Sequence, residues 1–437
     1  MIVYKVEGWT KGNLPVVLFA IKTGYSKQKY YDSNKRRFEV KVLVINCGSS
    51  SLKYRILDMR TEELLVKGLV ERIALPGSVI IQEKQGDRTE LDLPLQDHKD
   101  AISHVLGLLT DEVHGVLKSL DEISAVGHRI VHGGEHYSEA AYVTDEVIEA
   151  IEQCKDMAPL HNHAHVLGIR ACRDLMPNTP MVCVFDTAFH QTMPPESYLY
   201  AIPYEFYEKY KIRRYGFHGT SHGYVSKRAA EILGKDLKDL KMITCHLGNG
   251  ASLAAIKDGK CFDTSMGLTP LDGLVMGTRS GVLDPAILTF LAEKENMSAE
   301  QVLNMLNKKS GILGLSGISS DFRDVEAAAK EGNERAHQAL DVYVHRVKAY
   351  IGSYAAEMNG LDVLVFTAGV GENDRWIRSR ICENMDFLGI ELDPEKNQVQ
   401  GEEAIISTEA SRVKIMVLPT HEELVIARST KEIVEKL

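Results

Sequence analysis

One arrangement of strands and turns occurs twice along the chain, and this duplication constrains the fold more than any other feature of the sequence. Three short segments rich in β-branched residues open each half, and alternating helical and strand segments follow. The first turn of each half is built from small residues, in CGSSSL (47–52) and GNGASL (248–253), about two hundred residues apart. Because an internal repeat can decide a fold, the sequence predicts two similar α/β halves.

The expected elements follow from periodicity, segment length and turn signals. In the first half we expect strands over 41–46, 54–59, 63–70, 78–83, 125–131 and 181–185, and helices over 98–120, 145–155 and 163–175. In the second half we expect strands over 241–247, 252–258, 260–265, 363–367 and 413–418, and helices over 284–307, 334–358, 374–385 and from 421. Two such halves would enclose a cleft, where small-molecule sites commonly form.

The composition favours a multidomain globular protein that acts on a small molecule. With 437 residues, of which 44% are hydrophobic, the chain can form two or three cores. The net charge of −10 has no single-sign block, which argues against a nucleic-acid partner or an anionic membrane surface. No segment approaches the ~18 consecutive apolar residues of a membrane span. Seven scattered cysteines without a C-x-x-C pair fit a reducing compartment, so we expect a cytoplasmic protein without membrane contact.

The beginning of the chain differs from the rest. The first forty residues hold eight Lys and Arg against three acidic residues, although the whole chain is acidic. We expect residues 1–39 to be an extra leader, disordered or artefactual. A basic anchoring arm is the alternative.

The loop at 46–53 has the composition of a phosphate-binding turn. It joins two expected strands, so its backbone N–H groups and serine hydroxyls can face phosphate oxygens, with Lys53 as a point charge. The alternative is an ordinary hairpin of small residues. The sequence G-x-x-x-x-G-K-[ST] is absent here, which excludes a P-loop.

Two further loops suit a nucleotide. The loop at 246–252 occupies the corresponding place in the second half; its glycines allow close backbone approach, and Asn249 and Ser252 offer hydrogen bonds. The segment 366–373 follows an apolar strand and opens a helix, where adenine or ribose can pack on the backbone. An ordinary strand-to-helix turn is its alternative. Since the first two loops recur at matching positions, we expect the nucleotide phosphates to lie between them.

These loops, together with further motifs, resemble the acetate kinase family of the actin-like, sugar-kinase and Hsp70 superfamily. The similarity runs from about Lys41 to the C-terminus and includes GHRIVHGG (127–134), PLHN (159–162), FDTAFHQTMP (185–194), RYGFHGTSH (214–222), GLTPLDG (267–273), MGTRSG (276–281), SSDFRD (319–324) and PTHEEL (419–424). It implies a duplicated actin-like ATPase (ribonuclease H-like) fold with two βββαβαβα-type cores flanking a nucleotide cleft. The implied domains are 40–188 with 422–437, and 189–421. Family members start at a methionine before the first-strand lysine, where this chain has Val40.

The resemblance implies reversible transfer of the ATP γ-phosphoryl group to acetate, giving acetyl phosphate and ADP, by direct in-line displacement with Mg²⁺ (Mn²⁺ as an alternative). It assigns the acid carboxylate to Arg129 and Arg279, and two guanidiniums do suit a carboxylate or an acyl phosphate. The methyl group would contact Val131, Leu160, Pro270 and Phe217. The implied catalytic residues are Asp186, His218, Arg279 and Arg129, with His161 lining the site beside His218 and Arg279.

The resemblance also assigns the nucleotide, the metal and the assembly. The implied ATP contacts are Lys53, Ser49, Ser51, His246, Leu247, Gly248, Asn249, Gly250, Asp321, Phe322, Arg323, Gly369, Val370, Gly371, Glu372 and Asn373. Asn46 and Glu422 would coordinate the metal, with Glu423 as the alternative to Glu422, and the second half would form a homodimer. A zinc site at 161–165, with alternate histidines on one side of a strand, is the weaker interpretation because this chemistry uses oxygen-coordinated Mg²⁺.

Two other functions remain open. Propionate or butyrate could replace acetate, since one methylene gives an apolar pocket only about 1–3 kcal/mol of discrimination. A non-metabolic ATPase of the superfamily, such as a chaperone or filament subunit, is less favoured because it would leave the paired Arg129 and Arg279 without a purpose.

Overall fold

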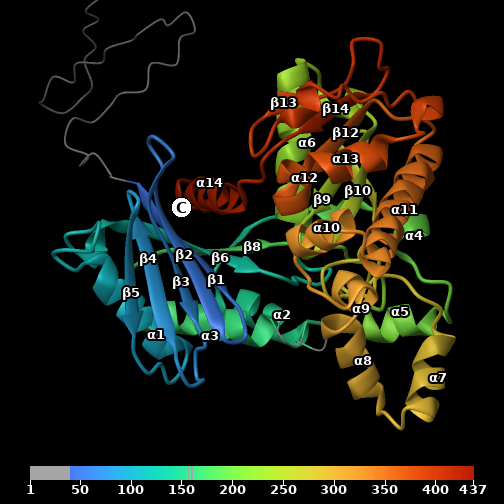
Figure 1. The fold of residues 1–437 in the computed structure, drawn as a ribbon. Helices are drawn as coiled ribbons and strands as arrows, with labels where there is room; N and C mark the ends of the chain where they lie inside the picture. Colours follow the sequence, from blue (N-terminus) through green and yellow to red (C-terminus); the bar gives the residue numbers. More distant parts are fainter. Residues whose placement is uncertain (1–39, 156, 159–160) are drawn as a thin grey trace, which may run out of the picture. The chain divides into compact units, whose positions relative to one another are not determined.

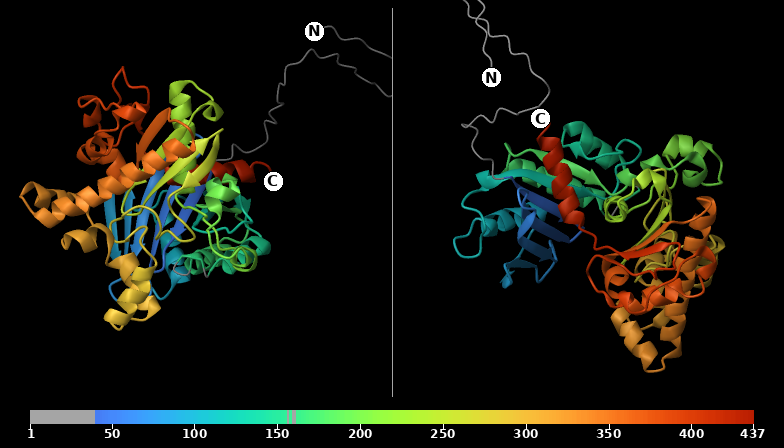
Figure 2. Two further views of the ribbon diagram at one scale, coloured as in Figure 1. Left: turned by 90° about the vertical axis from the view of Figure 1, so that its right-hand side faces the viewer. Right: turned by 90° about the horizontal axis from the view of Figure 1, so that it is seen from above.

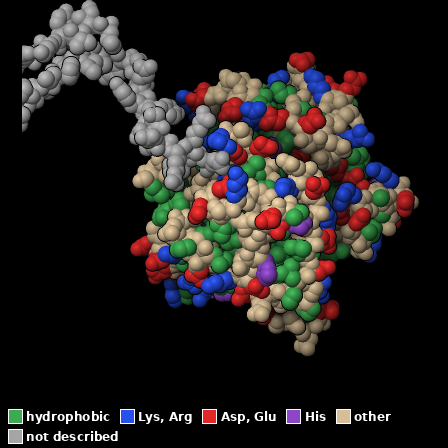
Figure 3. All heavy atoms as spheres, turned by 90° about the vertical axis from the view of Figure 1, so that its left-hand side faces the viewer, with side chains coloured by type: hydrophobic (Ala, Val, Ile, Leu, Met, Phe, Trp, Pro, Cys, Tyr) green, Lys and Arg blue, Asp and Glu red, His purple; other side chains and the backbone are tan. Residues whose placement is uncertain are grey.

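The computed structural model describes residues 40–155, 157–158 and 161–437, which form two β-sheets with helices packed on them (Figure 1). The expected leader over 1–39 and the expected site residue Leu160 lie outside the described residues. Within the described part, no helix combines the length and apolar character needed to cross a membrane. Basic and acidic side chains are intermixed on the face that Figure 3 shows, as the sequence led us to expect.

Each half of the chain contributes one sheet. The first has the strand order β5-β4-β3-β2-β1-β6-β8-β7, and the second has the order β11-β10-β9-β12-β14-β13. The strands of the first sheet are β1 (Lys41–Cys47), β2 (Ser51–Asp58), β3 (Glu63–Glu71), β4 (Val79–Lys84), β5 (Asp87–Asp92), β6 (Ile123–Ile130), β7 (Ala141–Tyr142) and β8 (Met181–Phe185). Those of the second are β9 (Met242–Leu247), β10 (Ala251–Lys257), β11 (Lys260–Thr264), β12 (Val363–Thr367), β13 (Ala404–Ile405) and β14 (Lys414–Val417).

The two sheets share one topology, which confirms the predicted duplication. In the first sheet, β1 pairs antiparallel with β2 and parallel with β6, and β8 continues in parallel. In the second, β9 pairs antiparallel with β10 and parallel with β12, and β14 continues in parallel. The central strands are buried on both faces, which explains why they read as continuous apolar runs.

Helices cover both sheets. They are α1 (His98–Leu109), α2 (Asp145–Gln153), α3 (Asn162–Leu175), α4 (Pro195–Tyr198), α5 (Glu205–Tyr210), α6 (Gly219–Leu233), α7 (Ala286–Lys294), α8 (Ala299–Lys308), α9 (Gly311–Ser316), α10 (Phe322–Lys330), α11 (Glu334–Glu357), α12 (Ala368–Asn373), α13 (Arg375–Cys382) and α14 (Glu422–Val434). The predicted second-half helices near 334–358 and 374–385 are confirmed as α11 and α13.

The last helix returns to the first sheet. Leu43 and Ile45 of β1 pack in one apolar cluster with α1 and α3, whereas Val42 and Val44 pack with residues of α14. Because successive side chains of a strand point to opposite faces, α14 covers the face of the sheet that α3 does not. Figure 2 shows α14, in dark red, beside the strands of the first sheet, with which it is in contact.

Several predicted elements need correction. The helix expected over 98–120 ends at Leu109, because the Thr110 hydroxyl binds the Leu106 carbonyl and the Asp111 carboxylate accepts from the next turn. The helix expected over 284–307 is two helices, α7 and α8, because Asn296 is left-handed (φ 51°) and a Ser298–Gln301 capping box starts α8. Eight elements of the structure were not predicted from the sequence: β5, β7, β13, α4, α5, α6, α9 and α10.

A buried guanidinium fastens α12 and α13 to the segment 397–399. Arg378 has no exposed surface, and it donates to the Asn397 side chain at 2.8 Å and to the carbonyls of Gly371, Glu372, Asn397 and Val399 at 2.8–3.0 Å. Burial lowers the pKa of Arg378 to about 10, so the guanidinium stays charged at neutral pH. This residue holds the backbone in place without any carboxylate partner among the described residues.

Replacing Arg378 with Met should therefore strongly destabilise the protein. The variant leaves several buried carbonyls without a donor, at about 1–3 kcal/mol for each one that water cannot reach, so we expect a loss of roughly 3 kcal/mol or more. The midpoint of urea-induced unfolding measures this loss. Arg375→Met, an exposed position on the same helix, is the matched control, and an equal midpoint shift in both variants would contradict the expectation.

Candidate functional site

Arg129 and Asp186 form a partly buried ion pair at the carboxyl ends of two neighbouring parallel strands of the first sheet. Arg129 is the penultimate residue of β6, and Asp186 directly follows β8. Arg129 donates from Nε to Asp186 Oδ1 at 3.2 Å and from Nη2 to Oδ2 at 2.5 Å. Burial and the nearby Glu422 raise the pKa of the Asp186 carboxyl, and Arg129 opposes that rise. Both residues were expected in the site, but their pairing was not.

The structure separates the two glutamates at the start of α14. Glu423 forms an ion pair with Arg55, with 3.1 Å between Glu423 Oε1 and Arg55 Nη2. Glu422, the first residue of the helix, is the stronger of the two in raising the pKa of Arg129, and its charge also acts on Asp186. Glu422 is therefore the glutamate whose charge acts on both members of the Arg129–Asp186 pair.

Two stacked imidazoles lie beside this pair. The rings of His218 and His246 have centroids 4.1 Å apart and planes 19° apart. His218 precedes α6 in the left-handed conformation (φ 57°), which is uncommon outside glycine and marks a locally constrained backbone. The next residue, Gly219, donates its N–H to the Asp186 carbonyl at 2.9 Å, which ties α6 to the end of β8. Burial lowers the pKa of both histidines, that of His246 to about 4, so both rings are neutral at pH 7.

Serine hydroxyls hold the Nδ1 atoms of both rings. Ser252 Oγ lies 2.8 Å from His218 Nδ1, and Ser221 Oγ lies 2.8 Å from His246 Nδ1. The expectation that Ser252 offers its hydroxyl to a ligand is wrong, because this side chain is fully buried and is shared between His218 and His222. The contact that fixes it comes from α6, an element that the sequence analysis missed.

Arg279 and His218 point toward one small volume above Gly250. A Cβ atom placed on Gly250 would lie 3.5 Å from Arg279 Nη1 and 3.5 Å from His218 Nε2. Arg279 donates to the Pro270 carbonyl at 3.2 Å, and no carboxylate in the described part of the chain forms an ion pair with it. Burial lowers the pKa of Arg279. A half-buried cation without a carboxylate partner, beside a neutral imidazole, suits a bound anion.

Three of the four expected apolar contacts lie in the described part of the chain. Val131 and Phe217 are buried in the same apolar cluster, and Pro270 contributes the carbonyl that binds Arg279. His161, just before α3, has its pKa lowered to about 4 by burial and then by the charges of Arg279 and Arg129. The structure thus brings His161 near both predicted arginines.

The histidine run at 161–165 does not form the strand on which the zinc interpretation depended. His163 and His165 lie on α3, where His163 is exposed and His165 is buried. Among the described residues, no group of three or more His, Cys, Asp or Glu side chains could hold a metal ion.

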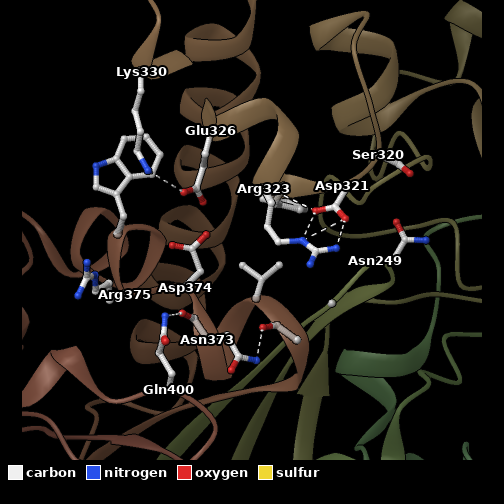
Figure 4. Close-up of a pocket in the computed structure, with 15 residues that line it drawn as sticks. Asn249, Ser320, Asp321, Arg323, Glu326, Lys330, Asn373, Asp374, Arg375 and Gln400 are labelled. Atoms are coloured by element: carbon white, nitrogen blue, oxygen red, sulfur yellow. Dashed lines mark hydrogen bonds and ion pairs between the residues drawn. The ribbon is translucent and has the colours of Figure 1, made fainter. Parts of the chain in front are cut away.

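A cavity of about 690 Å³ lies in the second half, where the nucleotide was expected (Figure 4). Eight predicted ATP contacts line it: Gly248, Asn249, Asp321, Phe322, Arg323, Gly369, Val370 and Asn373. Seven further lining residues were missed: Ser320, Glu326, Lys330, Asp374, Arg375, Trp376 and Gln400. Glu326 and Lys330 lie one and two turns beyond Phe322 on α10, so an amphipathic helix predicted there would have revealed them.

Gly371 and Glu372, two of the predicted ATP contacts on the strand-to-helix turn, are among the eight that do not line this cavity. Glu372 accepts from the N–H of Ala368 at 2.7 Å and from that of Thr420 at 2.9 Å. Its carboxylate therefore joins the start of α12 to the loop before α14. Glu372 lies in the strand-to-helix turn, as predicted, but its side chain accepts hydrogen bonds from the protein backbone.

The predicted phosphate loops are both strand hairpins. In the first, Asn46 pairs with Lys53 across β1 and β2, and the Gly48 N–H donates to the Ser51 carbonyl at 2.7 Å. In the second, Leu247 is buried and pairs with Ala251, and the Gly248 N–H donates to the Gly250 carbonyl at 3.1 Å. Ser49 and Lys53 are exposed, and Ser51 is partly buried. Lys53 lines a smaller hollow together with Arg55, Lys67, Glu83 and Glu423.

Two carboxylates face one another in the large cavity, which predicts a pH-dependent stability. Burial and Asp374 raise the pKa of Glu326 from 4.5 to about 8, with Lys330 opposing them. A group with a raised folded-state pKa contributes stability that is complete below the unfolded value and is lost as pH rises through the folded value. The melting temperature should therefore fall between pH 5 and 9, and Glu326→Gln should reduce that fall. Asp324→Asn, exposed on the same helix, is the control; the same fall in wild type and Glu326→Gln would refute the assignment.

Comparisons with known proteins show the family to which this chain belongs. Residues 41–428 match the sequence profile of the Acetokinase family. The acetate kinase of Treponema denticola is 61% identical over 397 residues, covering 91% of this chain and 100% of that protein, and acetate kinase 2 of Clostridium perfringens is 61% identical over 396 residues, covering 90% and 100%. The crystal structure of Porphyromonas gingivalis acetate kinase matches with a TM-score of 0.88 and 50% identity, covering 90% of this chain and 100% of that chain. A propionate kinase structure from Francisella tularensis matches with a TM-score of 0.84 and 44% identity, covering 90% and 99%. This chain therefore belongs to the acetokinase family.

Proposed function

We propose that this protein is an acetate kinase, which reversibly transfers the γ-phosphoryl group of ATP to acetate to give acetyl phosphate and ADP by direct in-line displacement. The observation that carries the proposal is the convergence of Arg279 Nη1 and His218 Nε2 on one small volume above Gly250. The acetate kinases named above, which are about 60% identical to this chain, support acetate as the acceptor.

Arg279 is the main contact for the reacting anion in this proposal. Acetate is already ionised at neutral pH, so the reaction needs positioning and charge neutralisation and does not need a strong base. Arg129 has its Nε and Nη2 committed to Asp186, which fixes its orientation and leaves Nη1 for the substrate. Val131, Phe217 and Pro270, together with Leu160, would surround the methyl group.

The nucleotide would span from the large cavity to this anion site. Adenosine would occupy the cavity lined by α10 and α12, and the phosphates would extend along the 246–252 hairpin toward Gly250. The neutral His218 would donate an N–H to the transferred phosphoryl group beside Arg279, and the hairpin at 46–53 would lie on the γ-phosphate side. His161 would line the same site.

The oxygen atoms near Arg129 fit Mg²⁺. Asp186 and Glu422 are close enough for one charge to raise the pKa of the other carboxyl, an arrangement that a divalent cation relieves. Mg²⁺ usually takes one or two protein carboxylates and completes its shell with water and phosphate, so Glu422 and Asn46, with Asp186 beside them, would hold it. When bound, it would neutralise charge on the phosphates.

We also propose how the protein assembles, where it is located and how its domains are divided. We place the protein in the cytoplasm as a homodimer formed through its second half, with domains at 40–188 with 422–437 and at 189–421. Large apolar side chains are exposed on and beside α7–α9, including Phe290 (60%) and Leu303 (48%), and exposed apolar patches commonly mark interfaces. A molar mass of one chain by light scattering would contradict the dimer.

Trapping the acyl phosphate with hydroxylamine tests the function. We expect acid-dependent ATP consumption with the highest kcat/KM for acetate, and lower values for propionate and butyrate. The similarity to a propionate kinase structure makes propionate the informative competitor. A higher kcat/KM for propionate would change the acid assignment, and ATP turnover independent of any acid would favour a superfamily ATPase of another kind.

A further inference from the structure

A chain of three hydrogen bonds lies behind His218, on the side away from Gly250. Thr244 Oγ1 lies 2.7 Å from His222 Nδ1, His222 Nε2 lies 2.8 Å from Ser252 Oγ, and Ser252 Oγ lies 2.8 Å from His218 Nδ1. Thr244, His222 and Ser252 have no exposed surface. The chain runs between β9, α6 and β10, so its geometry is fixed by packed elements on both sides.

The three hydrogen bonds can be donated in only two ways, either all toward His218 or all toward Thr244. A serine hydroxyl has one hydrogen, so Ser252 can donate to one of its two imidazoles and must accept from the other. Burial lowers the pKa of both His218 and His222, so each ring is neutral and carries its hydrogen on one nitrogen. The direction of the chain therefore decides whether His218 carries its hydrogen on Nε2 or on Nδ1.

Thr244 determines the direction. Within the residues that the structure describes, its buried hydroxyl has one hydrogen-bond partner, His222 Nδ1. If His222 donated to it, the threonine hydrogen would be left buried without an acceptor, at about 1–3 kcal/mol. Thr244 therefore donates to His222 Nδ1, His222 Nε2–H donates to Ser252, and Ser252 donates to His218 Nδ1.

We propose that the Thr244–His222–Ser252 chain holds His218 in its Nε2–H tautomer, so that an N–H donor faces the transferred phosphoryl group beside Arg279. The opposite tautomer would turn a nitrogen lone pair toward an anion, and that contact would be repulsive. Thr244, His222 and Ser252 are positioning residues, since none of them reaches the volume above Gly250. The inference rests on the proposed role of His218 and adds the residues that make that role work.

Thr244→Val and Thr244→Ser test the chain, because the first removes only the terminal hydroxyl at nearly constant shape and the second keeps it. With ¹⁵N-histidine in the full chain, long-range ¹H–¹⁵N spectra report which nitrogen of His218 carries the hydrogen. We expect Nε2–H in wild type and in Thr244→Ser, and a mixture or Nδ1–H in Thr244→Val. The kcat of Thr244→Val should fall roughly 10-fold, with the KM for ATP within about twofold, and Thr244→Ser should restore kcat.

Ser226→Ala is the matched control, since Ser226 is a fully buried serine on α6 whose hydroxyl donates to the Gly223 carbonyl, outside the chain. It should keep both the kcat and the Nε2–H signal. A wild-type Nδ1–H signal, or wild-type kcat with Nε2–H in Thr244→Val, would overturn the proposal. Wild-type kcat in His218→Ala would overturn the catalytic use of the tautomer, whereas a wild-type protein that forms no acyl phosphate would overturn the proposed function itself.

Discussion

Replacing Arg279 with Ala should lower kcat for acetyl phosphate formation by about 10³-fold, while ADP binding changes by less than about threefold. Among the described residues, no carboxylate forms an ion pair with the Arg279 guanidinium. Its Nη1 atom and His218 Nε2 both face the volume above Gly250. Removing one preorganised donor from a transition-state anion typically costs about 10²–10³ in rate, and the loss of a full positive charge places this variant at the upper end. Initial rates with hydroxylamine trapping, and calorimetric titration with ADP, measure the two quantities.

Two further variants separate charge from geometry at this position. Arg279→Lys keeps the charge but loses the planar fork, so its kcat should lie between those of wild type and Arg279→Ala. Arg335→Ala is the matched control, because Arg335 likewise donates to backbone carbonyls but is an exposed residue outside the predicted site. Wild-type turnover in Arg279→Ala, or a comparable loss in Arg335→Ala, would remove Arg279 from the reaction.

The fold was predictable from the sequence because its central strands are continuous apolar runs that can be recognised locally. Runs such as VLVI (42–45) and MITC (242–245) are buried on both faces of their sheets, and small-residue turns mark both hairpins, so the duplication was visible without any tertiary information. α6 was not predicted, because it follows a left-handed histidine inside the motif GFHGTSH and lacks a side-chain cap. From its residues alone, that motif indicates a site segment and gives no helix-start signal.

The identity of the site residues was more predictable than their partners. Arg129 and Asp186 could each be assigned from a motif, but their ion pair joins residues 57 positions apart and depends on the register of β6 with β8. Ser252 was misassigned for the same reason, since its partners are His222 on α6 and His218 just before that helix. Local sequence indicates which side chains can perform chemistry, whereas non-local packing decides which of their atoms remain free.

Replacing Asp186 with Asn should lower kcat by about 10²-fold or more and raise the Mg²⁺ concentration needed for half-maximal rate. The substitution keeps the shape of the side chain but removes the charge that orients Arg129 through two hydrogen bonds. Misplacing a positioned group by about 1 Å can cost 10²-fold in rate. Loss of one of two neighbouring carboxylates should also weaken the attraction for a divalent cation. Steady-state rates over a range of Mg²⁺ concentrations report both effects.

Asp263→Asn provides the control that distinguishes this from a general loss of a buried charge. Asp263 also lies near an arginine, with 3.7 Å between its Oδ1 and Arg214 Nε, and burial raises its pKa to about 7. It belongs to β11 and was not assigned to the site. Asp263→Asn should leave kcat and the Mg²⁺ dependence near wild type, because Asp263 lies outside the predicted site. Equal losses of kcat in both variants would mean that Asp186 affects the rate through stability alone. In that case its hydrogen bonds would not be what orients Arg129 for the reaction.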